Sequence, residues 1–177
     1  MARHVFDTLM ARGAEMDLRL CGTHALDSCR MEKAYRHYGH DIASTDHVLE
    51  AGLGFAVKLH KPRGRFGDFL GCEGVLRKEQ AGLSRRLMQF LLGDPRPLLY
   101  GNEAIIRDGR VAGYLTSGAY GHHLGAAVGL GYVACDPGEN AGTVLASTYA
   151  IEVAGEQVPA RASLVPFYDP RSERLRS

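Results

Sequence analysis

EAIIRDGRVAGYL, residues 103–115, is the stretch on which the expected fold depends. Two short runs rich in apolar and β-branched residues flank Asp108-Gly109, a dipeptide suited to the positive φ angles of a type I′ turn. Two further runs, TYAIEV (148–153) and QVPARA (157–162), flank Ala154-Gly155-Glu156, a three-residue connection in which glycine can take a left-handed position. The sequence therefore predicts two β-hairpins in the C-terminal half of the chain.

The hairpins belong to a longer segment of similar composition throughout, which begins at Ser84. Glycines recur, short runs are filled by β-branched and aromatic residues, and turn signals come roughly every ten residues. This pattern is typical of an antiparallel sandwich or barrel. We place a domain boundary near residue 83, with an α+β domain over residues 1–83 and a β-barrel domain over residues 84–177. The predicted fold class is α+β.

The first 83 residues predict a mixture of helices, strands and loops. Helices are expected where apolar residues recur at helical spacing or where helix formers lie between capping residues and glycines: residues 2–12, 23–35 with Thr23 as N-cap, and 72–80. Short strands are expected at residues 18–21 and 54–59. The basic stretch 61–68 contains glycine and proline and predicts a surface loop.

The composition limits the classes of protein that this chain can represent. With 45% hydrophobic and 23% charged residues it is an ordinary globular chain, and its net charge of +1 provides no electrostatic footprint for nucleic acid or an anionic membrane. The four cysteines, Cys21, Cys29, Cys72 and Cys135, stand singly, and we expect reduced, buried thiols. Because the sequence shows neither a leader peptide nor a long apolar run, we expect a cytoplasmic protein.

The densest group of chemically active residues is ALDSCRMEKAYRHYGHD, residues 25–41. A buried Arg30 or Glu32 in this stretch could hold a planar polar ligand through paired hydrogen bonds. The alternative is a solvated helix face with structural ion pairs, which are more common than ligand sites. The residues alone leave both interpretations open.

Two other patterns predict no site. His37, His40 and Asp41, and the pair His122-His123, lack a third ligand at metal-binding spacing, so we predict no metal. Residues 129–134 match G-x-G-x-x-A, but they lie inside a strand-like run instead of between a strand and a helix. We interpret these glycines as relief of crowding where strands bend or where another backbone approaches closely.

Several stretches together resemble the aminomethyltransferase, or glycine cleavage T-protein, family. They are RMEKAYRHYGHDI (30–42), LEAGLGFAVKL (49–59), FLGCEGVLRK (69–78) and GRVAGYLTSGAYGHHLGAAVGLGYV (109–133). The first and last are more similar to the sarcosine and dimethylglycine dehydrogenase branch. The resemblance covers the chain from His4 to about Tyr168. It implies part of a ferredoxin-like α/β layer followed by a C-terminal antiparallel β-barrel, gathered around a channel for tetrahydrofolate.

Carried over position by position, the resemblance implies four residues of the tetrahydrofolate site. Tyr35 and Phe55 fall where the family has aromatics at the pterin, and Arg30 and Glu32 match a Leu-Arg-Leu-Glu motif that braces the channel wall. No catalytic residue is assigned, because the family's aspartate and the glutamate of its Tyr-Thr-Gly-Glu motif would precede Met1. Leu26 stands where glycine-cleaving members carry a folate-binding arginine, a departure that fits the demethylating branch.

The resemblance implies a C-terminal fragment of a tetrahydrofolate-dependent aminomethyltransferase-like protein. The parent would be a sarcosine or dimethylglycine dehydrogenase that transfers a one-carbon unit from an N-methyl amine to tetrahydrofolate, with flavin in a separate upstream domain. Folate and the upstream domains are the expected partners, and the chain alone is expected to be inactive. The alternatives are a non-catalytic folate-binding accessory protein and a structural or docking module. An incomplete first domain would leave an apolar face, so we also expect self-association.

Overall fold

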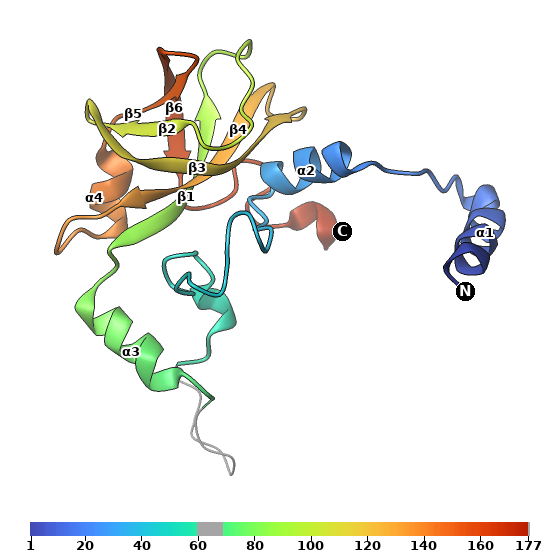
Figure 1. The fold of residues 1–177 in the computed structure, drawn as a ribbon, viewed down its shortest axis with the longest axis horizontal. Helices are drawn as coiled ribbons and strands as arrows, with labels where there is room; N and C mark the ends of the chain where they lie inside the picture. The colour runs from blue at the N-terminus through green and yellow to red at the C-terminus, as the bar shows by residue number, and fades with distance from the viewer. Residues whose placement is uncertain (60–68, 177) are drawn as a thin grey trace.

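The computed structural model describes residues 1–59 and 69–176, and a closed β-barrel forms its main body (Figure 1). Six antiparallel strands close in the order β1-β4-β3-β2-β5-β6. They are β1 (Arg85–Leu92), β2 (Ala104–Arg107), β3 (Arg110–Gly121), β4 (Ala126–Ala134), β5 (Tyr149–Val153) and β6 (Glu156–Ser163), with helix α4 (Ala141–Ala146) between β4 and β5. The barrel, together with the helices before it, confirms the predicted α+β fold class.

Both predicted hairpins are present, and the turn chemistry explains them. Asp108 and Gly109 have φ angles of 49° and 80°, so the β2–β3 connection is a two-residue turn with both central residues left-handed, as predicted. The β5–β6 connection is also a two-residue turn, because Val153 pairs with Glu156. The three-residue connection predicted there is wrong by one residue: Ala154 itself takes φ 51° and Gly155 follows with φ 86°.

Strand β1 is buried on both faces, which joins the barrel to helix α2 (Thr23–Glu32). All six strands contribute to one apolar cluster, to which β1 supplies Met88, Phe90 and Leu92. The alternate residues Leu87 and Leu91 face the other way and pack with Met31 of α2. Because a fully buried aliphatic or aromatic side chain contributes about 1.5–3 kcal/mol, α2 is held on the barrel by its own apolar cluster.

The glycines of β4 allow close packing inside the sheet. A Cβ on Gly131 would lie 2.6 Å from the carbonyl oxygen of Tyr114 and 2.7 Å from Ile105 Cδ1, and one on Gly129 would lie 2.6 Å from Leu115 Cδ1. The β3–β4 register shifts between Leu115 and Ser117, beside these positions. The residues of the G-x-G-x-x-A match therefore lie within a strand, and relief of crowding is their structural role.

The segment before the barrel contains helices and loops. Its elements are α1 (Ala2–Gly13), the 3₁₀ turns η1 (Ala14–Met16) and η2 (Gly54–Ala56), α2, and α3 (Cys72–Ala81), which ends before Gly82 as predicted; a last turn, η3 (Glu173–Leu175), follows the barrel. Helix α2 starts after Gly22, so Thr23 is not its N-cap, and it stops at Glu32 because Ala34 takes a left-handed φ of 51°.

The two strands predicted in this segment are wrong. Residues 18–21 are irregular, and residues 54–56 form η2 instead of a strand. A strand must satisfy its backbone groups on a neighbour, and among the described residues before β1 the only β pairing is an isolated bridge between Tyr38 and Ile42. The loop predicted over residues 61–68 lies outside the described residues.

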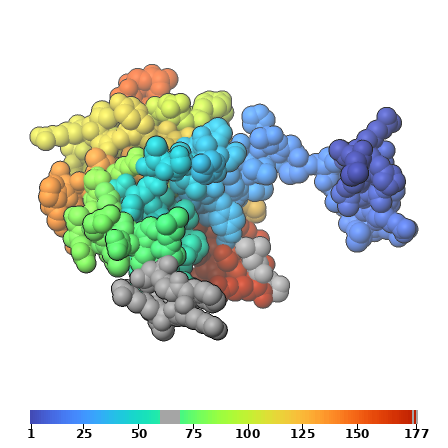
Figure 2. All heavy atoms as spheres, turned by 60° about the horizontal axis from the view of Figure 1, so that its bottom comes forward, coloured from blue at the N-terminus to red at the C-terminus, as the bar shows by residue number. Residues whose placement is uncertain are grey.

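The first helix stands apart from the barrel (Figures 1 and 2). Of its residues only Gly13 is buried, and Val5, Phe6 and Leu9 are about half exposed or more. The expectation of four buried thiols is wrong for the two cysteines just before and on α2. Cys21 and Cys29 are exposed, whereas Cys72 is buried and Cys135 is half-buried.

Candidate functional site

Arg30, on the last turn of α2, is enclosed by acceptors from three parts of the chain. Its Nε donates to Asp27 at 2.7 Å, its Nη1 to Asp41 at 2.7 Å and to the Tyr35 carbonyl at 3.2 Å, and its Nη2 to Ser117 of β3 at 2.9 Å. The side chain is 11% exposed. Four of its five N–H groups therefore have protein partners, so Arg30 braces the end of α2 against the loop that follows it and against strand β3.

Asp41 is the fixed point of this network, and its side chain is fully buried. Its Oδ2 accepts from Arg30 and from the His37 amide at 2.9 Å, and its Oδ1 accepts from the Thr116 hydroxyl at 2.6 Å. The Tyr132 hydroxyl donates to the Asp41 carbonyl at 3.1 Å, and burial raises the pKa of Tyr132 to about 12, so the donor proton stays in place at neutral pH. Asp41 thus ties the loop after α2 to strands β3 and β4.

Glu32 forms a second buried anchor on the same helix. One carboxylate oxygen accepts from the His123 amide at 2.6 Å, and the other lies 2.8 Å from His123 Nδ1. The carboxylate is 5% exposed, whereas the His123 side chain is 56% exposed. Glu32, like Arg30, is bound to the protein itself, and its partner is one of the two adjacent histidines for which the sequence predicts no metal.

Arg36 clamps together the two segments that carry Tyr35 and Phe55. It donates from Nη1 to the Ala34 carbonyl at 3.0 Å and from Nε to the Ala51 carbonyl at 3.0 Å. Its Nη2 reaches the Gly52 carbonyl at 3.3 Å. The turn after α2 and the loop before η2 are therefore held side by side by one side chain.

The two aromatics predicted at the pterin lie on these clamped segments and face outward. Tyr35 is 50% exposed and Phe55 is 81% exposed. Exposed rings on a fixed backbone offer flat faces for stacking at little cost in side-chain entropy. The four predicted residues thus divide into two exposed rings, Tyr35 and Phe55, and two side chains paired with protein groups, of which Glu32 is buried and Arg30 largely buried.

A further ion network fastens the loop before Phe55 to the barrel. Glu50 accepts from Lys78 of α3 at 2.7 Å, from the Ser84 hydroxyl at 2.7 Å and from Arg85 of β1 at 3.1 Å. Burial alone would raise the pKa of Glu50, but these three hydrogen bonds outweigh it and hold the pKa at about 2. Glu50 is therefore ionised at neutral pH and locks this loop against β1.

Two hollows of the described surface are not part of the group formed by the four predicted residues. Hollows of about 280 Å³, between β2, β5 and β6, and about 410 Å³, between the end of α3 and the β4–α4 connection, are lined by none of the four predicted residues. In the part of the chain that the structure describes, no three His, Cys, Asp or Glu residues are grouped so that they could hold a metal ion. Within the same residues, no helix has the length and apolarity needed to cross a membrane.

Sequence reasoning missed three residues that organise this surface: Arg36, Asp41 and His123. Asp41 and His123 stand out in the sequence in the two histidine patterns for which no metal is predicted. Arg30 and Thr116, two of the partners of Asp41, lie 11 and 75 positions from it in the chain, and Glu32 and His123 are 91 positions apart. No local spacing signals contacts of that range.

Curated relatives align with nearly the whole chain. It is 40% identical to 4-methylaminobutanoate oxidase (formaldehyde-forming) of Paenarthrobacter nicotinovorans, over 99% of this chain and 20% of the relative. It is 36% identical to the mitochondrial sarcosine dehydrogenase of Homo sapiens, over 97% of this chain and 18% of the relative. It is 35% identical to the mitochondrial pyruvate dehydrogenase phosphatase regulatory subunit of Mus musculus, over 93% and 20%. The chain spans about a fifth of the length of these relatives.

A solved structure shares the fold. The aminomethyltransferase T of the glycine cleavage system from Bartonella henselae superposes with a TM-score of 0.76 at 24% identity, over 96% of this chain and 44% of that one. Two family models match in sequence order: the GCVT N-terminal domain over residues 1–61 and the glycine cleavage T-protein C-terminal barrel domain over residues 85–169. The chain thus belongs to the glycine cleavage T-protein family of aminomethyltransferases, and its relatives include sarcosine and dimethylglycine dehydrogenases.

Proposed function

We propose that this chain forms one wall of a tetrahydrofolate site in a longer polypeptide, which we call the parent. The parent would transfer a one-carbon unit from an N-methyl amine to tetrahydrofolate, with flavin bound in an upstream domain. Family membership and the sarcosine and dimethylglycine dehydrogenase relatives support this reading. The cytoplasmic location expected from the sequence remains part of the proposal.

The observation that carries the proposal is the pair of exposed rings on a clamped backbone. Tyr35 and Phe55 sit on segments that Arg36 joins through three backbone carbonyls. A pterin is flat and aromatic, and offset stacking on a preset ring favours such a ligand by about 0.5–1.5 kcal/mol per ring. We therefore assign these two rings to one side of the pterin.

The residues of this chain would bind the pterin and hold it in position. Bound tetrahydrofolate would supply N5, the atom that accepts the one-carbon unit in this family. Tyr35 and Phe55 would stack on the pterin and exclude water from its face. Arg30 and Glu32 are already paired with protein groups, so they would hold the wall without touching the ligand. We assign no proton transfer to this chain.

Calorimetry with folinic acid tests the proposal. The parent is expected to bind folinic acid, and the isolated chain is expected to bind it much more weakly, since half a site leaves the ligand solvated on one face. A parent that folds but shows no heat of binding would refute the proposed function. Weak or absent binding by the isolated chain agrees with it.

A second candidate function is a non-catalytic module. It is favoured by the 35% identity to a protein named as a phosphatase regulatory subunit, over 93% of this chain. Under this alternative the parent binds no folate, or binds it without consuming an N-methyl amine. Assaying the parent for release of the demethylated amine in the presence of tetrahydrofolate separates the two functions.

Self-association is a further expected property of the chain when it is studied alone. Val5, Phe6 and Leu9 of α1 are exposed on a helix that contacts little else, and a second copy can cover the same apolar stripe. Light scattering after size exclusion at low micromolar concentration should show species larger than a monomer, and Phe6→Glu should shift them toward the monomer. A monomer alone for the unmodified chain would refute the expectation.

A further inference from the structure

The chain after the barrel returns to helix α2 and covers its carboxyl end. Gln89 of β1 is buried and joins the two, because its Nε2 donates to the Met31 carbonyl at 2.6 Å and its Oε1 accepts from the Phe167 amide at 2.8 Å. The Tyr168 amide points to the Glu32 carbonyl at 3.4 Å. Carbonyls at a helix end have no partner within the helix, and here the barrel and the returning chain supply partners.

An ion pair fastens the same contact. Lys33 Nζ donates to the Asp169 carbonyl at 2.7 Å and to its carboxylate at 3.0 Å, with Ser172 Oγ at 3.4 Å. The Lys33 and Asp169 side chains are only 12% and 11% exposed. Lys33 and Asp169 are 136 positions apart in the chain, so their ion pair joins the chain that follows the barrel to the end of the helix that precedes it.

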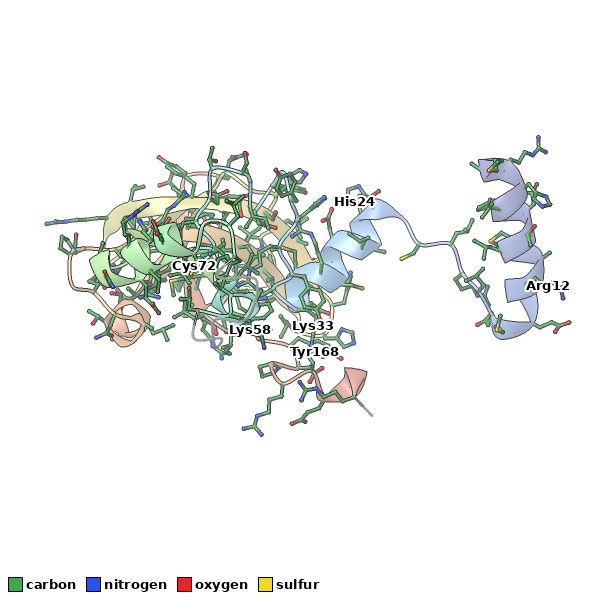
Figure 3. The ribbon with its side chains drawn as sticks, turned by 90° about the horizontal axis from the view of Figure 1, so that it is seen from below. Arg12, His24, Lys33, Lys58, Cys72 and Tyr168 are labelled. Carbon is green, nitrogen blue, oxygen red and sulfur yellow. The ribbon has the colours of Figure 1, made fainter. Side chains whose placement is uncertain are left out.

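A ring stack completes the contact from the barrel side. Tyr168 stacks on His123 with the ring centroids 4.5 Å apart and the planes 30° apart, and His123 in turn holds Glu32. Figure 3 shows Lys33 and Tyr168 next to one another beside the end of α2. Together these contacts act on Met31, Glu32 and Lys33, the last two residues of the helix and its C-cap.

We propose that residues 167–172, the C-terminal strap, fix the carboxyl end of α2, and that Lys33, Tyr168 and Asp169 are positioning residues for the tetrahydrofolate site. The inference rests on the proposed function, because the end of α2 carries Arg30 and Glu32 and leads directly to Tyr35. Ala34, between them, holds a left-handed φ of 51°, a conformation that alanine keeps only where its surroundings enforce it. The strap is part of that enforcement.

Hydrogen exchange on this chain tests the strap itself. The Tyr35 amide donates to the Arg30 carbonyl at 2.9 Å and reports on the end of α2. Lys33→Met and Asp169→Asn should each speed its exchange by about tenfold, and Lys33→Arg should restore slow exchange. Asparagine tolerates the left-handed φ of 43° at position 169, so that variant keeps the backbone of the strap.

The control variant is Arg171→Gln, which removes an 85% exposed charge from the same strap and should leave the exchange rate within twofold. Wild-type exchange rates in both Lys33→Met and Asp169→Asn would overturn the proposal.

Folinic acid binding by the parent tests positioning. Lys33→Met should raise Kd about tenfold and Lys33→Arg should recover it, with Arg171→Gln unchanged. Unchanged Kd in a variant with faster exchange would overturn the positioning role. A wild-type parent that binds no folinic acid would instead refute the proposed function. The exchange experiment would still test whether the strap fixes the carboxyl end of α2.

Discussion

Asp41→Ala should cost about 3–5 kcal/mol of folding free energy, because several donors lose one buried acceptor together. The substitution leaves the largely buried guanidinium of Arg30, the His37 amide and the Thr116 hydroxyl without their shared acceptor. Arg30 keeps its ion pair with Asp27, but donors that lose a buried acceptor each cost about 1–3 kcal/mol, because the interior solvates them poorly. Urea denaturation should show the loss as a lower midpoint with an unchanged slope.

The matched control is Asp7→Ala in α1. Asp7 also faces an arginine, Arg3, but at 3.7 Å and with both side chains exposed, so the expected change is below about 0.5 kcal/mol. A loss of less than about 1 kcal/mol for Asp41→Ala would show that the buried network does not hold the loop.

Gly131→Ala should destabilise the barrel by about 2–3 kcal/mol. The added methyl group would lie 2.6 Å from the Tyr114 carbonyl oxygen and 2.9 Å from Leu115 Cα, both of which are backbone atoms of the neighbouring strand. Backbone atoms of a paired strand cannot turn aside as the end of a flexible side chain can, so strands β3 and β4 would have to separate. Thermal unfolding followed by circular dichroism measures the change.

Gly74→Ala is the control for this prediction. Gly74 lies inside α3, and a Cβ there meets nothing within 4 Å, so alanine should stabilise the helix by about 0.5–1 kcal/mol. We expect Gly131→Ala to lower the free energy of unfolding and Gly74→Ala to raise it. A tolerated Gly131→Ala would mean that the β3–β4 contact is looser than the structure has it.

Local chemistry made part of this fold predictable. The turns at Asp108-Gly109 and at Gly155 are favoured because these residues readily adopt positive φ angles, and α3 is bounded by Gly71 and Gly82. These elements could therefore be predicted without knowledge of tertiary contacts. The strands expected at residues 18–21 and 54–59 failed for the opposite reason. A strand depends on a partner, and the described residues before β1 supply only one isolated bridge.

The candidate site was predictable only in part. Tyr35, Phe55, Arg30 and Glu32 came from family resemblance, and their roles at tetrahydrofolate stay predictions. The division into two exposed rings and two braces paired with protein groups depends on contacts that join residues far apart in the chain, such as Glu32 with His123 and Arg30 with Ser117. The charged residues of α2 alone could not distinguish a solvated helix face from a buried network.

The central claim is that Tyr35 and Phe55 form one side of a pterin cleft, and folinic acid titration of ring-truncated parents tests it most directly. Tyr35→Ala and Phe55→Ala should each raise Kd about fivefold to tenfold, whereas Tyr100→Ala, which removes an 80% exposed ring from a barrel loop, should leave Kd unchanged. Wild-type affinity in both Tyr35→Ala and Phe55→Ala would contradict the account.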